Sequence, residues 1–498
     1  MSPAQPPLLA NLLRTLPEAR LIETHISWVI VAGGYAYKLK KPVNLGFLDF
    51  STLDKRRTCC KEEIRLNRRL APDIYLAAIP ITGSADAPVL GGKGEAIEWA
   101  VQMRAFPADA TLDREAQITP QQIDALADRI AAFHLSLGPA SGYGAPAQIQ
   151  APALENLAQL AALPLPDDLC ARLTRIEAWT RNTGARLEPV FLQRQKDGCI
   201  RECHGDLHLG NIAWVDDAPL IFDCIEFNLA LRCIDVQSEI AFLVMDLTHR
   251  DQEALAWRAL NRYLETTGDY AGLAVLPYYL VYRALVRAKV EAIRAHQAGD
   301  DFALCRAYLD LAERLARPRR AQLLLMHGVS GSGKSWRSQH ALEALGAIRL
   351  RADVERKRLF GLGPLDSSRA IPGGIYTREA GARTLARLLE CAEALLAQGW
   401  TVILDATFLS RSWREPCVQM AQRQGAPWRI LSLEAAPDTL RARLHQRTTQ
   451  GGDASEADLA VLESQLAHQD ALTPEEAAHT LNGAAPLDSL LSSLSVSS

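Results

Sequence analysis

The first hundred residues combine short apolar strands with one charged helix. Residues 26–40 predict two β-strands joined by Gly33 and Gly34, because two glycines allow a tight hairpin turn. Residues 54–70 have the periodicity of a helix, and residues 98–106 return to strand character. This pattern predicts a small antiparallel sheet that carries one helix.

From residue 119 the apolar positions follow a helical period. Thr119 and Pro120 are typical of a helix cap and of the first helical position, and Ile123, Leu126 and Ile130 share one face. A hairpin is expected over residues 200–223, and further helices over residues 232–247 and 276–297.

After residue 320 strands alternate with helices. Strands are expected over residues 322–328, 348–353, 400–408 and 429–435, with helices from residue 334 and over 377–398. Such alternation predicts a parallel α/β sheet. Pro318 and the arginines around it, in residues 317–320, indicate a domain boundary whose charges stay in water, and residues 489–498 are expected to form a flexible tail.

The composition changes this picture only by exclusion. The chain has 498 residues, 48% hydrophobic and 22% charged, with a net charge of −4, which gives no overall attraction for nucleic acid or anionic membrane. No apolar run is long enough to span a bilayer, and no secretory leader is evident, so we expect a cytoplasmic protein. Ten cysteines without a C-x-x-C pair fit a reducing compartment.

Residues 328–335 spell G-V-S-G-S-G-K-S directly after an apolar strand and before a helix. Glycines at these positions let backbone N–H groups turn toward phosphate oxygens, whereas the alternative is a plain glycine-rich turn. Lys334 is expected to take part in catalysis by reaching the β and γ phosphates of ATP, and the Ser335 hydroxyl to hold Mg²⁺. The predicted nucleotide contacts are Gly328, Gly331, Ser332, Gly333, Lys334 and Ser335.

Two aspartates lie at the ends of predicted strands in this half. Asp405 follows the apolar run 402–404 and is expected near the same Mg²⁺; the alternative is that it caps the helix beginning near Thr407 or Ser410. Asp353 ends the strand 348–353, and ligands gather at the carboxyl ends of parallel strands. It is our candidate for orienting an acceptor hydroxyl, with a helix cap as the alternative.

Residues 321–483 resemble the P-loop small-molecule kinases of the zeta toxin and AAA type, a group that includes chloramphenicol phosphotransferase and polynucleotide kinase. The resemblance implies that Asp353 acts as the base and Arg356 as a substrate clamp. It also implies lid arginines that reach over the phosphates, which Arg443 and Arg447 match. For this arginine pair, solvated helix charges are the alternative. No residue of the acceptor pocket is recognisable.

A second phosphoryl-transfer pattern lies in residues 203–212, which contain H-x-D-L-x-x-x-N. Asp206 can accept the proton of an acceptor hydroxyl, and Asn211 can coordinate the metal that shields the phosphates. A turn at residues 216–217 brings Asp223 back to the same end of a hairpin, where it and Asn211 can bind Mg²⁺ through oxygen.

The same stretch offers a competing metal set in Cys199, Cys203, His204 and His208. An ordinary zinc finger separates its two ligand pairs by about a dozen residues, and this span is shorter. The zinc site is therefore the weaker interpretation of these residues.

The motif H-G-D-x-H-x-x-N at residues 204–211, followed by F-D-C-I-E at residues 222–226, resembles the signature of the aminoglycoside phosphotransferase and choline kinase branch of the protein-kinase-like fold. That resemblance implies a small lobe over 1–105 and a large lobe over 106–315. It implies a strand lysine on the α and β phosphates, held by a helix glutamate. It also implies that His204 and His208 brace the loop of residues 204–211, and that Asp235 is a buried support of this loop.

For the lysine and glutamate we choose Lys38 and Glu63. Lys38 and Lys40 lie on the same face of the second strand, so Lys40 and Glu62 are close competitors. A surface ion pair is the alternative.

The whole arrangement resembles a bacterial family of fusions between an aminoglycoside phosphotransferase-like domain and a P-loop ATPase or kinase domain. It predicts an α+β bilobal protein-kinase-like domain at 1–315, then an α/β P-loop domain with a parallel sheet at 321–488. Both halves are expected to use ATP and Mg²⁺ to phosphorylate hydroxyls of small-molecule acceptors.

Other functions stay open at this point. The P-loop half is alternatively an ATP-hydrolysing sensor that gates the first half, or a nucleic-acid end kinase. The absence of a basic stripe with interleaved aromatics argues against a nucleic-acid partner. A polycationic antibiotic needs an acidic cleft, and no acidic run identifies one. The sequence leaves the oligomeric state open.

Overall fold

The computed structural model describes residues 6–46, 48–450 and 454–495, with the backbone alone for residues 447–450. The chain divides into two units: residues 1–155 with 184–246, and residues 156–183 with 247–498. The domain boundary expected at 315–321 falls inside the second unit, in the loop between α10 and β11, and it stays a prediction.

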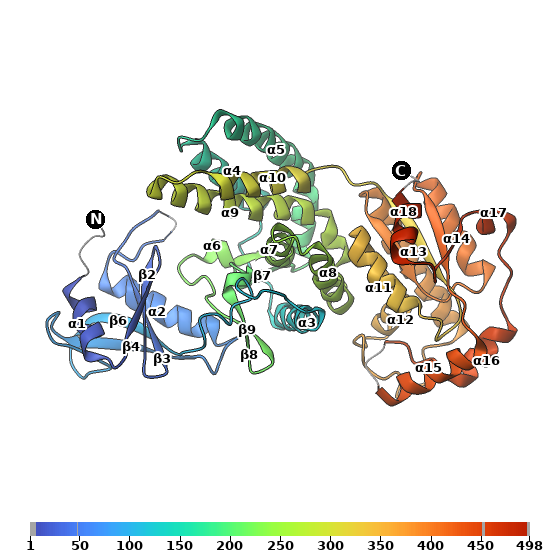
Figure 1. Cartoon of the computed structure of the whole chain (residues 1–498), viewed down its shortest axis with the longest axis horizontal. Helices are drawn as coiled ribbons and strands as arrows, with labels where there is room; N and C mark the ends of the chain where they lie inside the picture. The colour runs from blue at the N-terminus through green and yellow to red at the C-terminus, as the bar shows by residue number, and fades with distance from the viewer. Residues whose placement is uncertain (1–5, 47, 451–453, 496–498) are drawn as a thin grey trace. The chain divides into compact units, whose positions relative to one another are not determined.

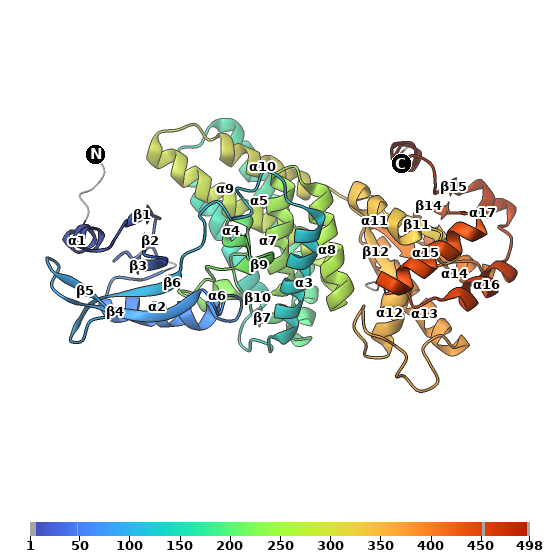
Figure 2. The same ribbon diagram turned by 60° about the horizontal axis from the view of Figure 1, so that its bottom comes forward.

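The first unit begins with a six-stranded antiparallel sheet of order β1-β2-β3-β6-β4-β5, seen in Figure 2. Its strands are β1 (Arg20–Glu23), β2 (Ser27–Ala32), β3 (Tyr35–Lys40), β4 (Tyr75–Gly83), β5 (Pro88–Leu90) and β6 (Ala96–Arg104). The predicted hairpin is confirmed: Gly33 and Gly34 have φ of 57° and 79°, and β2 pairs with β3 in antiparallel register. Glycine adopts two such angles in succession at little cost, because it has no Cβ.

One helix covers each face of this sheet. Leu9 and Leu12 of α1 (Pro7–Thr15) pack on Leu39 and its neighbours, whereas Ile64 of α2 (Leu53–Asn67) packs on Tyr75 from the other side. Side chains alternate along a strand, so Lys38 and Lys40 must face α2 when Leu39 faces α1.

The rest of the first unit carries helices and two two-stranded sheets, the β8–β9 hairpin and the pair of β7 with β10. These elements are α3 (Pro120–Ser136), α4 (Pro146–Ala161), α5 (Asp167–Lys196), β7 (Ile200–Glu202), η1 (Leu209–Asn211), β8 (Ile212–Val215), β9 (Ala218–Ile221), α6 (Leu229–Arg232), β10 (Cys233–Asp235) and α7 (Val236–His249), of which α4, α5 and α7 also contribute residues to the second unit. Thr119 caps α3 as predicted, its Oγ1 accepting from Gln122 N at 3.2 Å. The β8–β9 turn places Asp216 and Asp217 at positive φ, so the predicted reversal is confirmed.

The second unit combines helices with a parallel sheet of order β12-β13-β11-β14-β15. Its helices before the sheet are α8 (Glu253–Thr267), η2 (Tyr270–Ala274), α9 (Leu276–Ala298) and α10 (Ala303–Leu315). The strands are β11 (Gln322–His327), β12 (Ile348–Arg351), β13 (Thr401–Asp405), β14 (Trp428–Ser432) and β15 (Thr480–Asn482). The parallel sheet predicted from alternation is confirmed.

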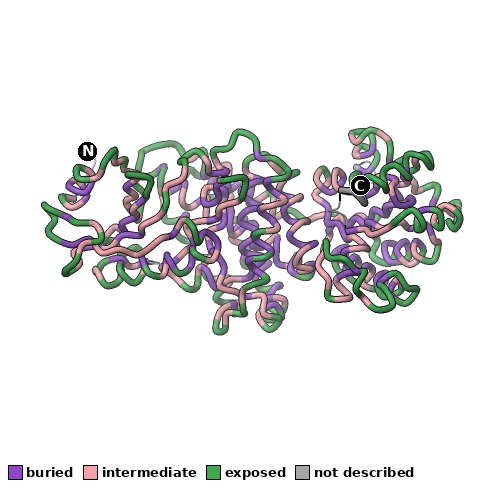
Figure 3. The backbone as a smooth tube through the Cα atoms, turned by 90° about the horizontal axis from the view of Figure 1, so that it is seen from below, coloured by how far each residue is buried: buried purple, intermediate pink, exposed green. Residues whose placement is uncertain are grey.

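Helices connect and flank these strands, as Figure 1 shows. They are α11 (Lys334–Leu345), α12 (Ala352–Leu359), α13 (Arg378–Ala397), α14 (Arg411–Arg423), α15 (Pro437–Gln450), α16 (Leu459–Ala467), α17 (Pro474–Ala478) and α18 (Leu487–Ser495). In Figure 3 the buried backbone of both units is purple and the exposed backbone green. Among the described residues, no helix is both long and apolar enough to cross a membrane.

Two local expectations were wrong. Residues 489–495 form most of α18 rather than a flexible tail, because Leu490 and Leu494 enter the apolar core beneath β11 and α11; residues 496–498 lie outside the described part of the chain. In the segment 317–320, Arg319 does not stay in water: its guanidinium lies 3.7 Å from the ring centre of Trp400 and 5.2 Å from that of Trp257. Arginine stacks favourably on aromatic faces, which fixes this linker.

The burial of α18 leads to a stability prediction. Replacing Leu494 by alanine should lower the free energy of unfolding of the second unit by about 2–5 kcal/mol, the usual cost of a cavity left by a core leucine. Urea unfolding followed by tryptophan fluorescence measures it. Ser492→Ala, an exposed site on the same helix, is the control, and an equal midpoint for both variants would show that α18 does not pack on the core.

Candidate functional site

Two strand lysines of the first unit reach the same carboxylate of α2. Lys38 Nζ lies 2.9 Å from Glu63 Oε1, and Lys40 Nζ lies 2.6 Å from Glu63 Oε2. Beyond α2, Lys38 also contacts Asp223 and Lys40 contacts Glu226. The geometry therefore joins the chosen pair, Lys38 and Glu63, but it makes Lys40 a partner of Glu63 as well.

The competitor Glu62 lies elsewhere. Its carboxylate is 3.0 Å from Arg65 and 3.4 Å from Arg232, on the outer side of α2. Among the described residues Glu62 therefore pairs with arginines and with neither lysine, and of the two lysines Lys38 is the one that contacts Asp223.

The lysine cluster is almost dry. Burial alone would lower the pKa of Lys38 and of Lys40, but the surrounding carboxylates raise both above the ordinary lysine value. Burial raises the pKa of Glu63 too, yet the two ammonium groups bring it below its usual value. Asp223 is the member of the cluster that faces solvent, with 42% of its side chain exposed, while Glu63 is fully buried.

The catalytic loop predicted at residues 204–211 closes on itself. Asn211 Nδ2 donates to the carbonyl of Asp206 at 2.9 Å and to its carboxylate at 3.0 Å. The two residues with predicted roles therefore lie side by side, and because Asn211 uses its amide nitrogen for these bonds, its amide oxygen is the atom that can bind a metal. His208 Nε2 is 3.4 Å from the same Asp206 carboxylate.

His204 braces the loop, as expected. Its Nδ1 accepts from Asp206 N at 3.3 Å and its Nε2 lies 2.8 Å from the carbonyl of Phe222, so a neutral ring satisfies both contacts. Burial lowers the pKa of His204, which favours that neutral form. The histidine thereby joins the loop to the strand end before Asp223.

Asp223 has a left-handed backbone conformation, with φ of 66°. Its backbone N–H donates to Tyr75 Oη at 3.0 Å, and the next N–H, of Cys224, donates to Asn67 Oδ1 at 2.9 Å. These two bonds from the sheet and α2 fix the backbone that turns the Asp223 carboxylate toward Lys38.

Two buried acids of α7 hold the catalytic loop, and the sequence analysis missed both. Glu239 accepts from His204 N at 2.6 Å and from Gly205 N at 2.8 Å, and Asp246 accepts from Leu209 N at 2.9 Å. An acid inside an apolar helix, as in V-Q-S-E-I-A-F, was the available signal, because such a group must find donors.

Asp235, implied as a buried support of the loop, is buried, and its carboxylate forms a two-point ion pair with Arg194 at 2.6 and 2.7 Å. It also accepts from Gln237 N at the start of α7. Asp235 therefore anchors the start of the helix that carries Glu239 and Asp246.

The four residues of the competing zinc set, Cys199, Cys203, His204 and His208, do not come together as one group of ligands. Within the described residues, the one group of three metal-ligating side chains close together is His134, Cys203 and Glu239, and it includes neither His204 nor His208. Both carboxylate oxygens of Glu239 already accept backbone N–H groups. His204 and His208 serve the loop instead.

In the second unit the phosphate loop follows β11 and opens α11, as predicted. Gly328, Gly331 and Gly333 have φ of 141°, 82° and 98°. At Gly328 a Cβ would lie 2.4 Å from the carbonyl oxygen of Leu433, so this position excludes any side chain. Lys334 is buried and its Nζ donates to the carbonyl of Val329 at 2.8 Å.

A pocket of about 230 Å³ opens over this loop. It is lined by Ser330, Gly331, Gly333, Lys334, Ser335, Trp336, Arg351, Asp353, Asp405, Ala406, Thr407, Arg443, Leu444 and Ser455. The structure thus brings together the predicted residues Lys334, Ser335, Asp353 and Asp405.

Asp405 ends β13 and does not cap α14, whose cap is Ser410. Its Oδ2 accepts from Ser338 Oγ at 3.0 Å, and Arg351 Nε is 3.9 Å away. Asp353 lies two residues beyond the end of β12, in the first turn of α12, and is not its cap. It accepts from Arg356 Nη1 at 2.7 Å, so the predicted base and clamp form a pair.

The lid expected from α15 is partly described. Arg443 donates to the carbonyl of Gly331 at 3.2 Å, and Leu440 and Leu444 of the same helix are buried in an apolar cluster with Val329. The side chain of Arg447 lies outside the described part of the chain. A further contact was missed: Gln465 of α16 accepts from Ser330 N of the phosphate loop at 2.7 Å.

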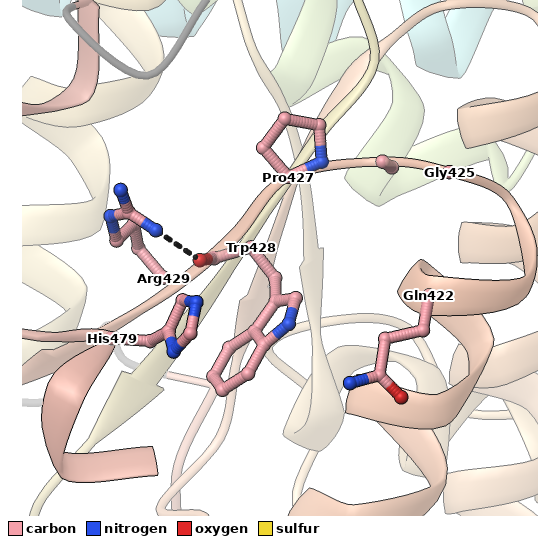
Figure 4. A pocket seen from close by; sticks show the side chains of 7 residues that line it. Gln422, Gly425, Pro427, Trp428, Arg429 and His479 are labelled. Atoms are coloured by element: carbon pink, nitrogen blue, oxygen red, sulfur yellow. Dashed lines mark hydrogen bonds between the residues drawn. The ribbon is translucent and has the colours of Figure 1, made fainter. Parts of the chain in front are cut away.

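A second depression lies away from this chemistry (Figure 4). Gln422, Gly425, Trp428, Arg429 and His479 line it, with Trp428 and His479 stacked at 4.2 Å between ring centres. It sits where β14 begins, whereas ligands of parallel sheets gather where strands end, and it contains no predicted site residue. The phosphate-loop pocket is therefore the better site despite its smaller volume.

The residues of both centres fit a magnesium-bound triphosphate. Within the described residues the buried Ser332 Oγ of this loop has no hydrogen-bond partner. Ser335 and Asp405 offer hydroxyl and carboxylate oxygen, and Asn211 and Asp223 offer amide and carboxylate oxygen. Mg²⁺ prefers oxygen ligands of these kinds.

Comparisons with known proteins agree with the two centres. Residues 56–276 match the model of the Phosphotransferase enzyme family, and residues 323–472 match the model of an AAA domain. The first match contains Asp206, Asn211 and Asp223, and the second contains the phosphate loop. The chain is thus an ATP-dependent phosphotransferase with a protein-kinase-like half and a P-loop half.

More particularly, the chain belongs to the family of two curated mycobacterial proteins, Rv2004c of Mycobacterium tuberculosis (strain ATCC 25618 / H37Rv) and Mb2027c of Mycobacterium bovis, both described as uncharacterized. Each is 31% identical over 461 residues, which cover 90% of this chain and 90% of the relative.

Solved structures similar to parts of the chain include a gluconokinase from Sinorhizobium meliloti 1021 and an ethanolamine kinase from Plasmodium vivax. The first is 22% identical and covers 35% of this chain and 89% of its own, with a TM-score of 0.24. The second is 13% identical and covers 62% and 84%, with a TM-score of 0.39. At these TM-scores neither likeness carries an argument about function.

The contact of α7 with the catalytic loop predicts a local change in stability. Glu239→Gln replaces one accepting oxygen by a donor facing a backbone N–H, so the opening free energy of residues 203–211 should fall by about 1–3 kcal/mol. Hydrogen–deuterium exchange of peptides from this loop measures it. Glu177→Gln, at an exposed position of α5, is the control. Unchanged protection of the loop in Glu239→Gln would contradict the role of Glu239.

Proposed function

We propose that each half is a kinase that transfers the γ-phosphoryl group of MgATP to a hydroxyl of a small-molecule acceptor. The observation that supports this proposal is that each unit brings together a cation for the phosphates, oxygen ligands for a metal and a carboxylate for the acceptor. In the first unit Lys38 contacts Asp223 and Asn211 contacts Asp206. The two pairs are joined where Phe222 N, next to Asp223, donates to the carbonyl of Asn211 at 3.0 Å.

In the protein-kinase-like half, Lys38 binds the α and β phosphates and Glu63 holds its ammonium group in place. Asp206 accepts the proton of the acceptor hydroxyl while the oxygen of that hydroxyl forms a bond to the γ phosphorus. At the same time the bond between the γ phosphorus and the β–γ bridging oxygen breaks, and ADP is released. Asn211 and Asp223 would hold Mg²⁺, which would supply positive charge to neutralise the phosphates.

In the P-loop half, Lys334 and the backbone N–H groups of residues 328–335 bind the phosphates. Ser335 and Asp405 hold Mg²⁺. Asp353 orients the acceptor hydroxyl, and Arg356, which contacts both Asp353 and the face of the exposed Tyr376 at 4.8 Å, holds the acceptor. Arg443 covers the loop, and Arg447 is proposed to join it.

The pair of Asp353 and Arg356 also favours a second candidate. The Asp353 carboxylate already accepts from Arg356 Nη1 at 2.7 Å, so it has a partner before any acceptor is bound, and this half can bind and slowly hydrolyse ATP without an acceptor. It would then be a nucleotide sensor that gates the first half. The fate of the γ phosphate separates the two: a labelled organic product for the kinase, and inorganic phosphate alone for the sensor.

Single-site variants test the two centres separately. The chain is incubated with γ-labelled ATP and fractionated metabolites, and labelled products are separated by chromatography. Asp206→Asn should slow formation of one product class by about 10²–10⁴-fold, because the proton acceptor is lost. Lys334→Ala should slow the other by at least about a hundredfold, because a cation on the transferred phosphate is lost.

The controls are Asp217→Asn, in the exposed β8–β9 turn, and Arg411→Ala, at the exposed start of α14, both expected to match the parent protein. A 5′-hydroxyl oligonucleotide in a parallel reaction tests the end-kinase alternative, and we expect no label in it. If neither Asp206→Asn nor Lys334→Ala alters any acceptor-dependent turnover, the proposed function is wrong.

The number of nucleotide sites gives an independent prediction. Calorimetric titration with a nonhydrolysable ATP analogue and Mg²⁺ should saturate near two equivalents per chain, because each half has its own set of phosphate ligands. Lys334→Ala should reduce this to one. If the parent protein saturates at one equivalent, one of the two halves is not a kinase. If it binds no nucleotide, neither half is a kinase.

A further inference from the structure

A helix from the phosphotransferase-family half completes the edge of the P-loop sheet. β12 is an edge strand, so its outer N–H and C=O groups have no neighbouring strand. Asn261 of α8 supplies the missing bonds: its Oδ1 accepts from Arg349 N at 2.8 Å and its Nδ2 donates to the carbonyl of Ala347 at 2.9 Å. Residues 253–267 lie within the match at 56–276, whereas β12 lies within the match at 323–472.

The same helix places a buried carboxylate on β12. Glu265 Oε1 accepts from Arg349 Nε at 3.0 Å and Nη2 at 2.7 Å, and Glu265 Oε2 is 3.6 Å from Arg351 Nη1. Its side chain is 3% exposed. Burial would raise the pKa of Glu265, but the two arginines bring it below the ordinary value, so the group is ionised.

These arginines continue to the proposed magnesium ligands. Arg349 Nη1 donates to Ser338 Oγ at 3.2 Å and, at 3.4 Å, to the carbonyl of Ser335. Ser338 Oγ in turn donates to Asp405 Oδ2 at 3.0 Å. Glu265 is therefore separated from both Ser335 and Asp405 by no more than two intervening side chains.

Arg351 gives the arrangement its chemical consequence. Its guanidinium lines the phosphate-loop pocket between two carboxylates, 3.6 Å from Glu265 and 3.9 Å from Asp405. An arginine that closed fully on Asp405 would occupy the oxygen that a metal needs. The charge of Glu265 draws Arg351 the other way, at a buried position where ion pairs are weakly screened.

We propose that Glu265 is a positioning residue of the P-loop centre: it holds Arg351 away from Asp405, so that helix α8 of the phosphotransferase-family half sets the affinity of the P-loop half for Mg²⁺. This inference rests on the proposed nucleotide site of residues 328–335. It adds that the site takes one of its determinants from a helix outside the AAA-domain match.

The test measures Mg²⁺ affinity rather than turnover, on the full chain. Binding of a nonhydrolysable ATP analogue is titrated by calorimetry with and without Mg²⁺, and the signal that Lys334→Ala abolishes is assigned to the P-loop site. Glu265→Gln should raise the apparent Kd for Mg²⁺ at this site about tenfold or more, the size of a typical coupling between sites. Binding of the analogue without Mg²⁺ should change less than twofold.

Arg258→Gln is the matched control. It removes an ion pair of 2.9 Å between α8 and Glu343 of α11, at the same contact but outside the chain of residues that leads to Asp405. Both constants should stay within twofold of the parent protein.

A double variant identifies the route. In a protein that already carries Arg351→Gln, Glu265→Gln should change the Mg²⁺ constant less than twofold, because the arginine that would close on Asp405 is gone. Glu265→Asp keeps the charge on a shorter side chain, and it should raise the constant less than Glu265→Gln does. This milder variant also serves if Glu265→Gln does not fold.

Three results would overturn the inference: an unchanged Mg²⁺ constant in Glu265→Gln, an equal loss of binding with and without Mg²⁺, and a full effect of Glu265→Gln that persists beside Arg351→Gln. The second of these would mean that Glu265 only supports the fold. Failure of the proposed function has a different signature, because the parent protein would then show no binding that Lys334→Ala removes.

Discussion

The first unit depends on burying four charges that must be paired. Lys38, Lys40, Glu63 and Glu226 have almost no contact with water, and removing one partner from such a group typically costs several kcal/mol. The four side chains come from β3, from α2 and from the segment after β9, which are distant in the sequence. Their pairing therefore fixes where the sheet and α2 meet that segment. Asp223, which also contacts Lys38, is the acid beside these four that faces solvent.

The two halves supply positive charge to phosphates by different physical means. The first half relies on a side-chain ammonium group whose pKa is raised by its neighbours, so its cation is positioned by ion pairs. The P-loop half relies largely on backbone N–H groups and a helix start, where glycine backbone angles do the positioning. The first design can be disturbed by a change of charge, and the second by the addition of a Cβ, as at Gly328.

Motifs read along the chain predicted what local geometry dictates. The Gly33–Gly34 turn, the Thr119 cap, the phosphate loop and the parallel sheet were all accessible, because each depends on neighbouring residues. What was missed depends on residues far apart in sequence: Glu239 and Asp246 reach back to the catalytic loop, and Gln465 reaches the phosphate loop. The α18 error has the same origin, since Ser-rich residues 489–495 look unstructured until the core that receives Leu490 and Leu494 is known. The sequence alone could not separate Lys38 from Lys40, because side chains two residues apart on a strand point to the same face. Their different partners, Asp223 and Glu226, appear only in the folded structure.

The stacking of Arg319 between Trp257 and Trp400 bears on how such a fusion is inherited. The linker between the two family matches is usually the place where recombination can exchange one catalytic module for another. Here that linker is clamped by an aromatic residue from each side, and α8 supplies the hydrogen bonds that the edge strand lacks. A replacement module would have to bring a matching Trp400 and a compatible edge strand with it. The stretch from residue 253 onward should therefore diverge as one block among descendants of this gene, with α8 changing in step with the sheet it covers.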